Sequence, residues 1–184
     1  FETEKEEAIT VTVKGTEAYG DFHFTTKKER SHTIPVYGLY ADADNTVILS
    51  DESGAESSVI IRTKPLPELV KRPAYVKENG PHMAEQLMFL SPTSDALIAG
   101  YDYRGDCRWY CSLNIVFAIH RLANGNILIG TERLVAPPYN TSGLYEMSLI
   151  GKIYTEYRIP GSYHHDHAEL PNGCLLYTSD AADE

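Results

Sequence analysis

The chain has 184 residues, of which 42% are hydrophobic, and a formal net charge of −10. Its length allows one or two domains with a buried core. The acidic balance and the lack of any run of Lys and Arg argue against nucleic acid and anionic membrane surfaces as partners, and no apolar run is long enough to span a bilayer.

Short alternating runs of Val, Ile, Thr and aromatic residues predict strands along the chain. Before residue 65 we expect strands at 9–15, 21–25, 32–40, 45–50 and 58–64. After residue 80 we expect them at 85–91, 96–102, 107–112, 115–120, 126–131, 143–150 and 152–159. Only PELVKR (67–72) is compatible with a helical turn, so the sequence predicts an all-β chain.

The organisation changes at the Pro-rich, polar segment PLPELVKRPAYVKENGP, residues 65–81. The runs before this segment predict a small sandwich of hairpins, and the segment itself reads as a linker or an edge connection. We therefore expect an N-terminal β-sandwich domain with its linker over 1–80, followed by a second β domain over 81–173.

A repeat marks the second part of the chain. The segments IHRLANGNILIGT (119–131) and HAELPNGCLLYTS (167–179) align, each with a strand before and after an Asn-Gly turn. The coinciding pairs are Leu122 with Leu170, Asn124 with Asn172 and Gly125 with Gly173. The residues of each pair lie 48 positions apart. Because this spacing is near the length of one four-stranded propeller blade, the repeat predicts successive blades of a β-propeller.

Metal-ligand patterns are weak. The three cysteines, Cys107, Cys111 and Cys174, form no CxxC pair. The first two lie four residues apart on a predicted strand, where they share a face but are too distant to form a disulfide. We expect them to be small apolar side chains. The histidines that stand alone in the sequence are His23, His32, His82 and His120.

Three histidines and an aspartate gather in the segment YHHDH, residues 163–167. On a strand, His165 and His167 would share one face with Tyr163, and His164 and Asp166 would share the other. Spacing leaves three interpretations open. These are a zinc site that needs a third ligand, structural histidines with satisfied hydrogen bonds, and an imidazole that acts as a nucleophile or an acid–base group.

Several motifs together resemble the arylsulfate sulfotransferase family. They are ITVTVKG, SHTIPVYGLYADADNTVIL, AGYDYRGDCRWY, HRLANGNILIG and YHHDHAELPNG, the last preceded by YEMSLIGKIYTEYRIPG. The resemblance covers residues 8 to 173 and implies a small β-sandwich followed by the first blades of a six-bladed β-propeller. It also implies transfer of a sulfuryl group from a phenolic sulfate ester to a phenol acceptor, without a nucleotide donor, through a transient sulfohistidine and without a cofactor or metal.

The same resemblance suggests site residues. His165 best matches the axis-facing histidine of the family and His164 is the second choice, while His167 is expected to be structural or to line the channel wall. Asp166 either caps the turn or orients an imidazole, and we favour the cap. The later family motifs, with the sulfated histidine and an arginine, have no counterpart in this sequence.

The resemblance further implies a periplasmic or secreted protein with phenolic substrates, no nucleic-acid or membrane partner, and a homodimer as one option for the full-length protein. Two other functions stay open at this point. One is a binding propeller without chemistry, and the other is a metal-dependent hydrolase.

The final segment, CLLYTSDAADE (174–184), matches the codons of a sequencing adapter read in frame, without a gap. The alternative is an outgoing blade strand, CLLYTS, with an acidic tail, DAADE. We favour the adapter and expect the natural sequence to end here at Gly173. Because two blades cannot close a ring, we expect this chain, expressed alone, to be unstable or to aggregate and to lack sulfotransferase activity.

Overall fold

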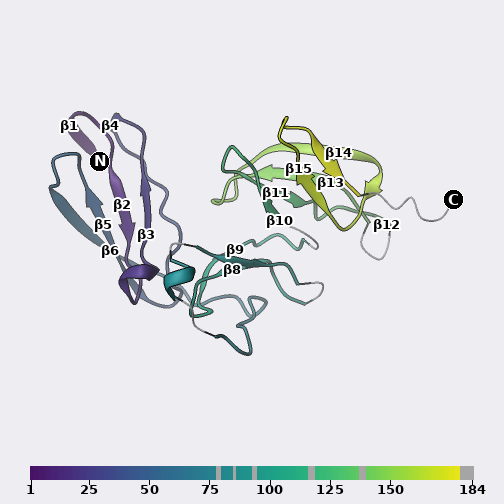
Figure 1. The fold of residues 1–184 in the computed structure, drawn as a ribbon, viewed down its shortest axis with the longest axis horizontal. Coiled ribbons are helices and arrows are strands. Elements are labelled where there is room, and N and C mark those ends of the chain that lie inside the picture. Colours follow the sequence, from purple (N-terminus) through teal and green to yellow (C-terminus); the bar gives the residue numbers. More distant parts are fainter. Residues whose placement is uncertain (78–79, 85, 93–94, 116–118, 137–139, 179–184) are drawn as a thin grey trace. The chain divides into compact units, whose positions relative to one another are not determined.

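The computed structural model of the protein describes residues 1–77, 80–84, 86–92, 95–115, 119–136 and 140–178. The prediction of an all-β chain is confirmed, because these residues form antiparallel strands and only two short 3-10 helices (Figure 1). None of the described helices has the length and apolar character needed to cross a bilayer. The chain divides into two compact units, Phe1–Met88 with Gly100–Trp109 and Phe89–Ala99 with Tyr110–Glu184.

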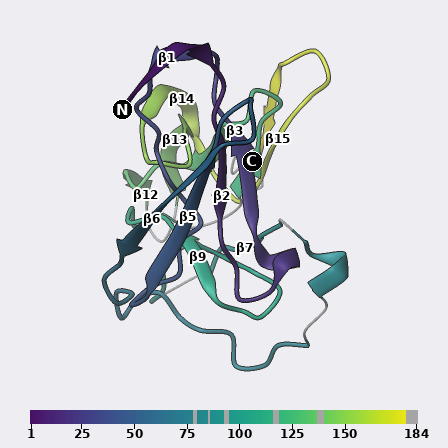
Figure 2. The ribbon, with the colours of Figure 1, turned by 90° about the vertical axis from the view of Figure 1, so that its left-hand side faces the viewer.

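The first unit contains a four-stranded sheet with the order β3-β2-β5-β6, whose strands lie side by side in Figure 2, and a two-stranded ribbon, β1-β4. The strands are β1 (Glu2–Glu7), β2 (Thr10–Val13), β3 (Phe22–Thr25), β4 (Glu29–Ser31), β5 (Asp44–Ser50) and β6 (Glu56–Arg62). The 3-10 helices are η1 (Ala18–Gly20) and η2 (Gly80–His82).

Strand β2 shows why this sheet forms. Its sequence, Thr-Val-Thr-Val, alternates, so Val11 and Val13 are fully buried while the threonines are half-buried. Residues opposite β2 come from β3 on one side and β5 on the other. Ile9 and Val47 complete the buried cluster, which makes this sheet the core of the unit.

The prediction of a strand over 32–40 was wrong. This segment has no ladder partner among the described strands, although Ile34 and Val36 pack against the core of the sheet. Pro35 lacks an N–H to donate to a ladder, and Gly38 takes a φ of +79°. The alternation of apolar residues in this segment therefore marks the side chains that face the core, and it does not mark a paired strand.

Strand β1 was missed for the opposite reason. Its sequence, Glu-Thr-Glu-Lys-Glu-Glu, is mostly exposed, apart from the buried Glu7, and has no apolar alternation. It pairs with β4 through an irregular register, with Glu2 opposite Ser31 and Glu7 opposite Glu29. Backbone pairing and a few polar contacts, such as that of the Thr3 hydroxyl with the carbonyl of Arg30 at 3.3 Å, hold this ribbon, so apolar alternation gives no signal for it.

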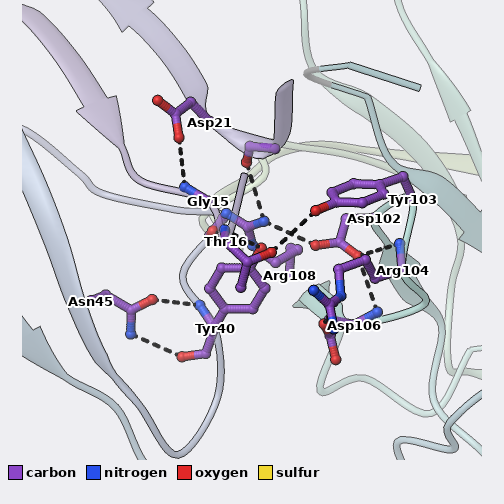
Figure 3. Close-up of polar contacts among 12 residues, drawn as sticks. Gly15, Thr16, Asp21, Tyr40, Asn45, Asp102, Tyr103, Arg104, Asp106 and Arg108 are labelled. Atoms are coloured by element: carbon purple, nitrogen blue, oxygen red, sulfur yellow. Dashed lines mark hydrogen bonds and ion pairs between the residues drawn. The ribbon is translucent and has the colours of Figure 1, made fainter. Parts of the chain in front are cut away.

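Strands β7 (Met88–Leu90), β8 (Ala99–Tyr101) and β9 (Cys107–Tyr110) form a three-stranded sheet. The turn between β8 and β9 is organised by Asp102, whose Oδ1 accepts hydrogen bonds from the backbone N of Arg104 at 3.0 Å and of Asp106 at 3.1 Å (Figure 3). Gly105 takes a φ of +78° in this turn, a conformation that glycine adopts without strain.

The side chain of Arg108 on β9 is buried in the first unit, and Figure 3 shows it next to Asp102. Its Nη1 lies 3.0 Å from Oδ2 of Asp102, and its Nε donates to the carbonyl of Gly38 at 2.6 Å. The guanidinium carbon also lies 3.8 Å from the ring centre of Tyr40 and 4.5 Å from that of Phe22. Ion pairing, hydrogen bonding and cation–π contact therefore fasten the β8–β9 hairpin to the N-terminal part of the unit.

The second unit is built on a meander in which β10 pairs with β11, β11 with β13, and β13 with β14. The short strand β12 also pairs with β13, beyond the end of its pairing with β11. A separate hairpin, β15-β16, follows. The bounds are β10 (Ile119–Arg121), β11 (Ile127–Gly130), β12 (Leu134–Ala136), β13 (Asn140–Met147), β14 (Ile153–Tyr163), β15 (His167–Glu169) and β16 (Leu175–Tyr177). The core comprises Leu122, Leu128, Leu144, Ile159 and Tyr163.

The sequence repeat is visible in the hairpins β10-β11 and β15-β16. The backbone N of Leu122 donates to the carbonyl of Asn126 at 2.8 Å, and that of Leu170 donates to the carbonyl of Cys174 at the same distance. Both turns close on a glycine with positive φ. The cross-strand pairs also coincide when one hairpin is shifted onto the other, as Ile119 with Ile129 and His167 with Tyr177 show. The two segments thus form equivalent hairpins.

The closed ring of a propeller does not follow from these strands. The described part of the second unit contains one meander and one further hairpin, and the propeller stays a prediction. The domain boundary at residue 80 and the separate status of 174–184 also stay predictions.

Candidate active site

The segment 161–167 is not a continuous strand, because it bends at 164–166. Strand β14 ends at Tyr163, and β15 begins at His167. His165, between them, has a φ of +72°, and Ser162 has a φ of +84°. Because the alternation rule holds only in extended backbone, the expectation that His165 and His167 share a face with Tyr163 on one strand was wrong.

The bend separates the predicted histidines. The side chain of His165 is exposed and that of His164 is half-buried, and their rings contact each other edge to face, with 3.5 Å between centroids. His167 is buried, with 3% of its surface exposed. Of the three histidines, the best-matching candidate is therefore the one most accessible to a substrate.

His167 uses both ring nitrogens inside the unit. Nε2 lies 2.9 Å from the carbonyl of Leu128, and because a carbonyl only accepts, Nε2 carries the proton. Nδ1 lies 2.7 Å from the hydroxyl of Tyr163. Burial lowers the pKa of His167, which favours the neutral ring with Nδ1 as an acceptor.

Tyr163 is fully buried beside this ring. Its hydroxyl lies 2.7 Å from Nδ1 of His167 and 3.1 Å from the backbone carbonyl of His165. Burial, and secondly the charge of Asp166, raise the pKa of Tyr163, so the hydroxyl keeps its proton at neutral pH. One proton is shared between two acceptors, and the bond to His165 holds the bend.

Asp166 joins the bend to β10. Its Oδ1 accepts from the backbone N of His167 at 2.8 Å and lies 3.2 Å from Nε2 of His120. The bond from the His167 backbone, with a smaller contribution from His120, lowers the pKa of Asp166. The Asp166 carboxylate is thus both a cap for the bend and a partner of an imidazole, which unites the two alternatives expected for it.

His120 was not selected from the sequence, where it looked isolated. Its ring lies 4.8 Å from that of His167, centroid to centroid, in an edge-to-face contact. The repeat could have identified His120. The shift that places Leu122 on Leu170 also places Ile119 on His167. His120 therefore follows directly the position that is equivalent to His167. Leu128 gave no signal, since it contributes only its backbone carbonyl.

Thr178 braces the other side of the bend. Its backbone N donates to the carbonyl of Asp166 at 2.9 Å, its hydroxyl accepts from the N of Asp166 at 3.0 Å, and its own carbonyl accepts from the N of His164 at 3.1 Å. The Thr178 hydroxyl also donates to the carbonyl of His164. Thr178 belongs to the segment 174–184, whereas Tyr163, His167 and His120 do not.

A metal centre has little support. Within the described ranges, no three His, Cys, Asp or Glu side chains are placed to hold a metal ion. Of the isolated histidines, the fold brings His120 to the motif, where it contacts Asp166 and His167; His23, His32 and His82 belong to the other unit. The arrangement is suited to acid–base work by an exposed imidazole beside a carboxylate–imidazole pair.

Comparison with known families gives two matches. A model described as arylsulfotransferase (ASST) matches residues 73–184, a range that contains the whole candidate site. A model described as arylsulfotransferase Ig-like domain matches residues 1–65. No curated protein and no solved structure matches the chain significantly.

Proposed function

Because the chain belongs to the arylsulfotransferase family, we propose that it is part of an enzyme that moves a sulfuryl group from a phenolic sulfate ester to a phenol acceptor without a nucleotide donor. The proposed architecture is a β-sandwich followed by blades of a six-bladed propeller. The equivalent hairpins β10-β11 and β15-β16, which recur at a blade-length interval, support stacked blades.

The observation that carries this proposal is the bend at 164–166 inside the matched range. It presents the exposed imidazole of His165 next to the half-buried imidazole of His164. A carboxylate–imidazole pair, Asp166 with His120, lies at its base. Imidazole titrates near neutral pH, so a positioned histidine can move a proton to or from a phenolic oxygen.

In the proposed reaction a histidine nitrogen attacks sulfur, and the S–O bond to the first phenol breaks with its electron pair on that oxygen. A second phenol then loses its proton and attacks sulfur, which breaks the N–S bond. We assign no residue of this sequence to carrying the sulfuryl group. His165, with His164 as the alternative, donates a proton to the departing phenolic oxygen and takes one from the acceptor.

The test replaces 174–184 with the native continuation of the gene, because we expect the 184-residue chain itself to release no phenol from an aryl sulfate. His165→Ala should slow transfer by about 10²-fold for esters of weakly acidic phenols. The loss should be much smaller for 4-nitrophenyl sulfate, whose phenolate departs without a proton. His23→Ala, at an exposed position of the other unit, is the control.

Equal losses for both esters would overturn the acid–base role of His165. Unchanged transfer in the His165→Ala and His164→Ala variants would remove both residues from the reaction. A folded, extended chain that binds phenolic sulfates without any transfer would favour a binding propeller.

We extend the proposal to location and assembly: export to the periplasm or cell exterior, and a homodimer for the full-length protein. Both follow from the family alone. Cell fractionation of the natural host and the solution mass of the extended protein would test them.

A further inference from the structure

We propose that Tyr163 and His167 are positioning residues, which hold the bend 164–166 in the conformation that presents His165 and take no part in the transfer themselves. The inference rests on the proposed function for the role of His165.

His167 is unsuited to receive or deliver a group. Its Nε2 proton is given to the carbonyl of Leu128 at 2.9 Å, and its Nδ1 faces the hydroxyl of Tyr163 at 2.7 Å. Only 3% of its surface is exposed. A substrate could reach either nitrogen only after the local structure opened.

Tyr163 connects this buried ring to the backbone of the bend. Its hydroxyl lies 3.1 Å from the carbonyl of His165. The resulting chain runs from His165 through Tyr163 and His167 to the carbonyl of Leu128 on β11. The bend is thereby tied to the first hairpin of the repeat without help from residues 174–184.

The conformation of His165 explains why such a tie is needed. A φ of +72° is disfavoured for a residue with a side chain. It persists only where surrounding bonds hold it. The Tyr163 hydroxyl supplies one bond from within the unit, and the Asp166 carboxylate, bound to the His167 backbone N at 2.8 Å, supplies another.

The experiment uses the extended chain, in which the native continuation replaces 174–184, and needs no catalysis. Tyr163→Phe removes one hydroxyl, and amide hydrogen exchange is followed in the peptide that spans 162–167. Loss of one hydrogen bond should raise the exchange rate there about fivefold. The matched control is Tyr157→Phe, because the Tyr157 hydroxyl donates to Glu146 at 2.9 Å in the same sheet, away from the bend.

A second measurement uses the extended chain without a substitution, so that it stands even where Tyr163→Phe fails to fold. Diethyl pyrocarbonate acylates accessible neutral imidazoles, and peptide mapping gives a rate for each histidine. His165 should react at least about tenfold faster than His167. Comparable rates for the two, or equal exchange in Tyr163→Phe and Tyr157→Phe, would overturn the proposal.

The two proposals fail separately. In the extended chain, Tyr163→Phe should lower kcat for sulfuryl transfer and leave KM unchanged, because it misplaces His165 without touching substrate. If the extended chain shows no transfer at all, the proposed function fails, while the exchange and acylation results still decide whether Tyr163 and His167 hold the bend.

Discussion

Arg108 and Asp102 form an ion pair with 3.0 Å between Nη1 and Oδ2, and solvent reaches neither side chain. A buried pair of this kind holds its partners in place, because either charge without the other would be buried and uncompensated. The pair lies where the β8–β9 hairpin meets the segment matched by the Ig-like domain, so its removal should affect the stability of the whole first unit.

Asp102→Asn tests this pair. Asparagine keeps the Oδ1 acceptor for the β8–β9 turn but removes the charge. We therefore expect the free energy of unfolding of the first unit to fall by about 3–5 kcal/mol. The single tryptophan of the chain, Trp109, reports on urea unfolding next to Arg108. The control is Asp42→Asn, whose exposed pair with Arg62 at 2.9 Å should cost no more than about 1 kcal/mol. Similar losses in both variants would contradict the assignment.

The stability of the second unit should fall as the pH drops below about 6.5. Burial lowers the pKa of His167 in the folded chain, so the unfolded chain binds the proton first, and stability present above pH 6.5 is lost as the pH falls. Tyr163, His120 and Asp166 face this ring. The lowered pKa of Asp166 acts only below its ordinary value of 3.8, so the window from pH 6.5 to 5 belongs to His167.

His167→Gln keeps a donor for the Leu128 carbonyl and removes the titration. Thermal unfolding between pH 7 and 5 should therefore show a shallower slope in this variant than in the parent chain. His23→Gln, in the other unit, serves as the control. An unchanged slope in His167→Gln would show that another group causes the acid sensitivity.

Gly143→Ala should be among the most damaging substitutions in β13. A Cβ there would lie 1.8 Å from the backbone carbonyl oxygen of Tyr157, which cannot move aside within the β13–β14 ladder. We expect a loss of about 3 kcal/mol. Gly125→Ala, where a Cβ meets no atom within 4 Å but φ is +87°, should lose only about 1 kcal/mol. Thermal unfolding of the two variants compares steric conflict with backbone strain.

One of the three thiols should react quickly in the folded chain. Cys107 and Cys111 are buried, and burial raises the pKa of both, whereas Cys174 is exposed. A disulfide reagent should titrate one fast thiol in native protein and three after denaturation. Cys174→Ser should abolish the fast phase, and a fast phase that survives this substitution would contradict the burial of the other two.

The sequence predicted the all-β class and the repeat because both depend on local alternation and on turn residues. It also selected the segment 163–167. It could not place the individual histidines, because the φ of +72° at His165 depends on bonds from Tyr163 and Thr178 that alternation does not encode. The same limit explains the error at 32–40, where inward-facing residues occur without a ladder partner.

Arg108 and Leu128 show a second limit. Their roles arise from contacts across long stretches of chain, 70 residues in the case of Arg108 with Gly38 and 39 in the case of His167 with Leu128. Neither a lone arginine on a strand nor a backbone carbonyl can be recognised as important from the neighbouring sequence. Only the fold identifies them.

The two hairpins of the repeat are synthesised one after the other, and a hydrogen bond joins them. The backbone N of Ala123, in the turn of the first hairpin, donates to the Glu169 carboxylate at 2.7 Å across 46 residues. Synthesis proceeds at about 5–20 residues per second. Glu169 is therefore added several seconds after Ala123, and the hydrogen bond can form only then. The turn of the first hairpin is therefore completed by a residue of the second hairpin, which is synthesised later.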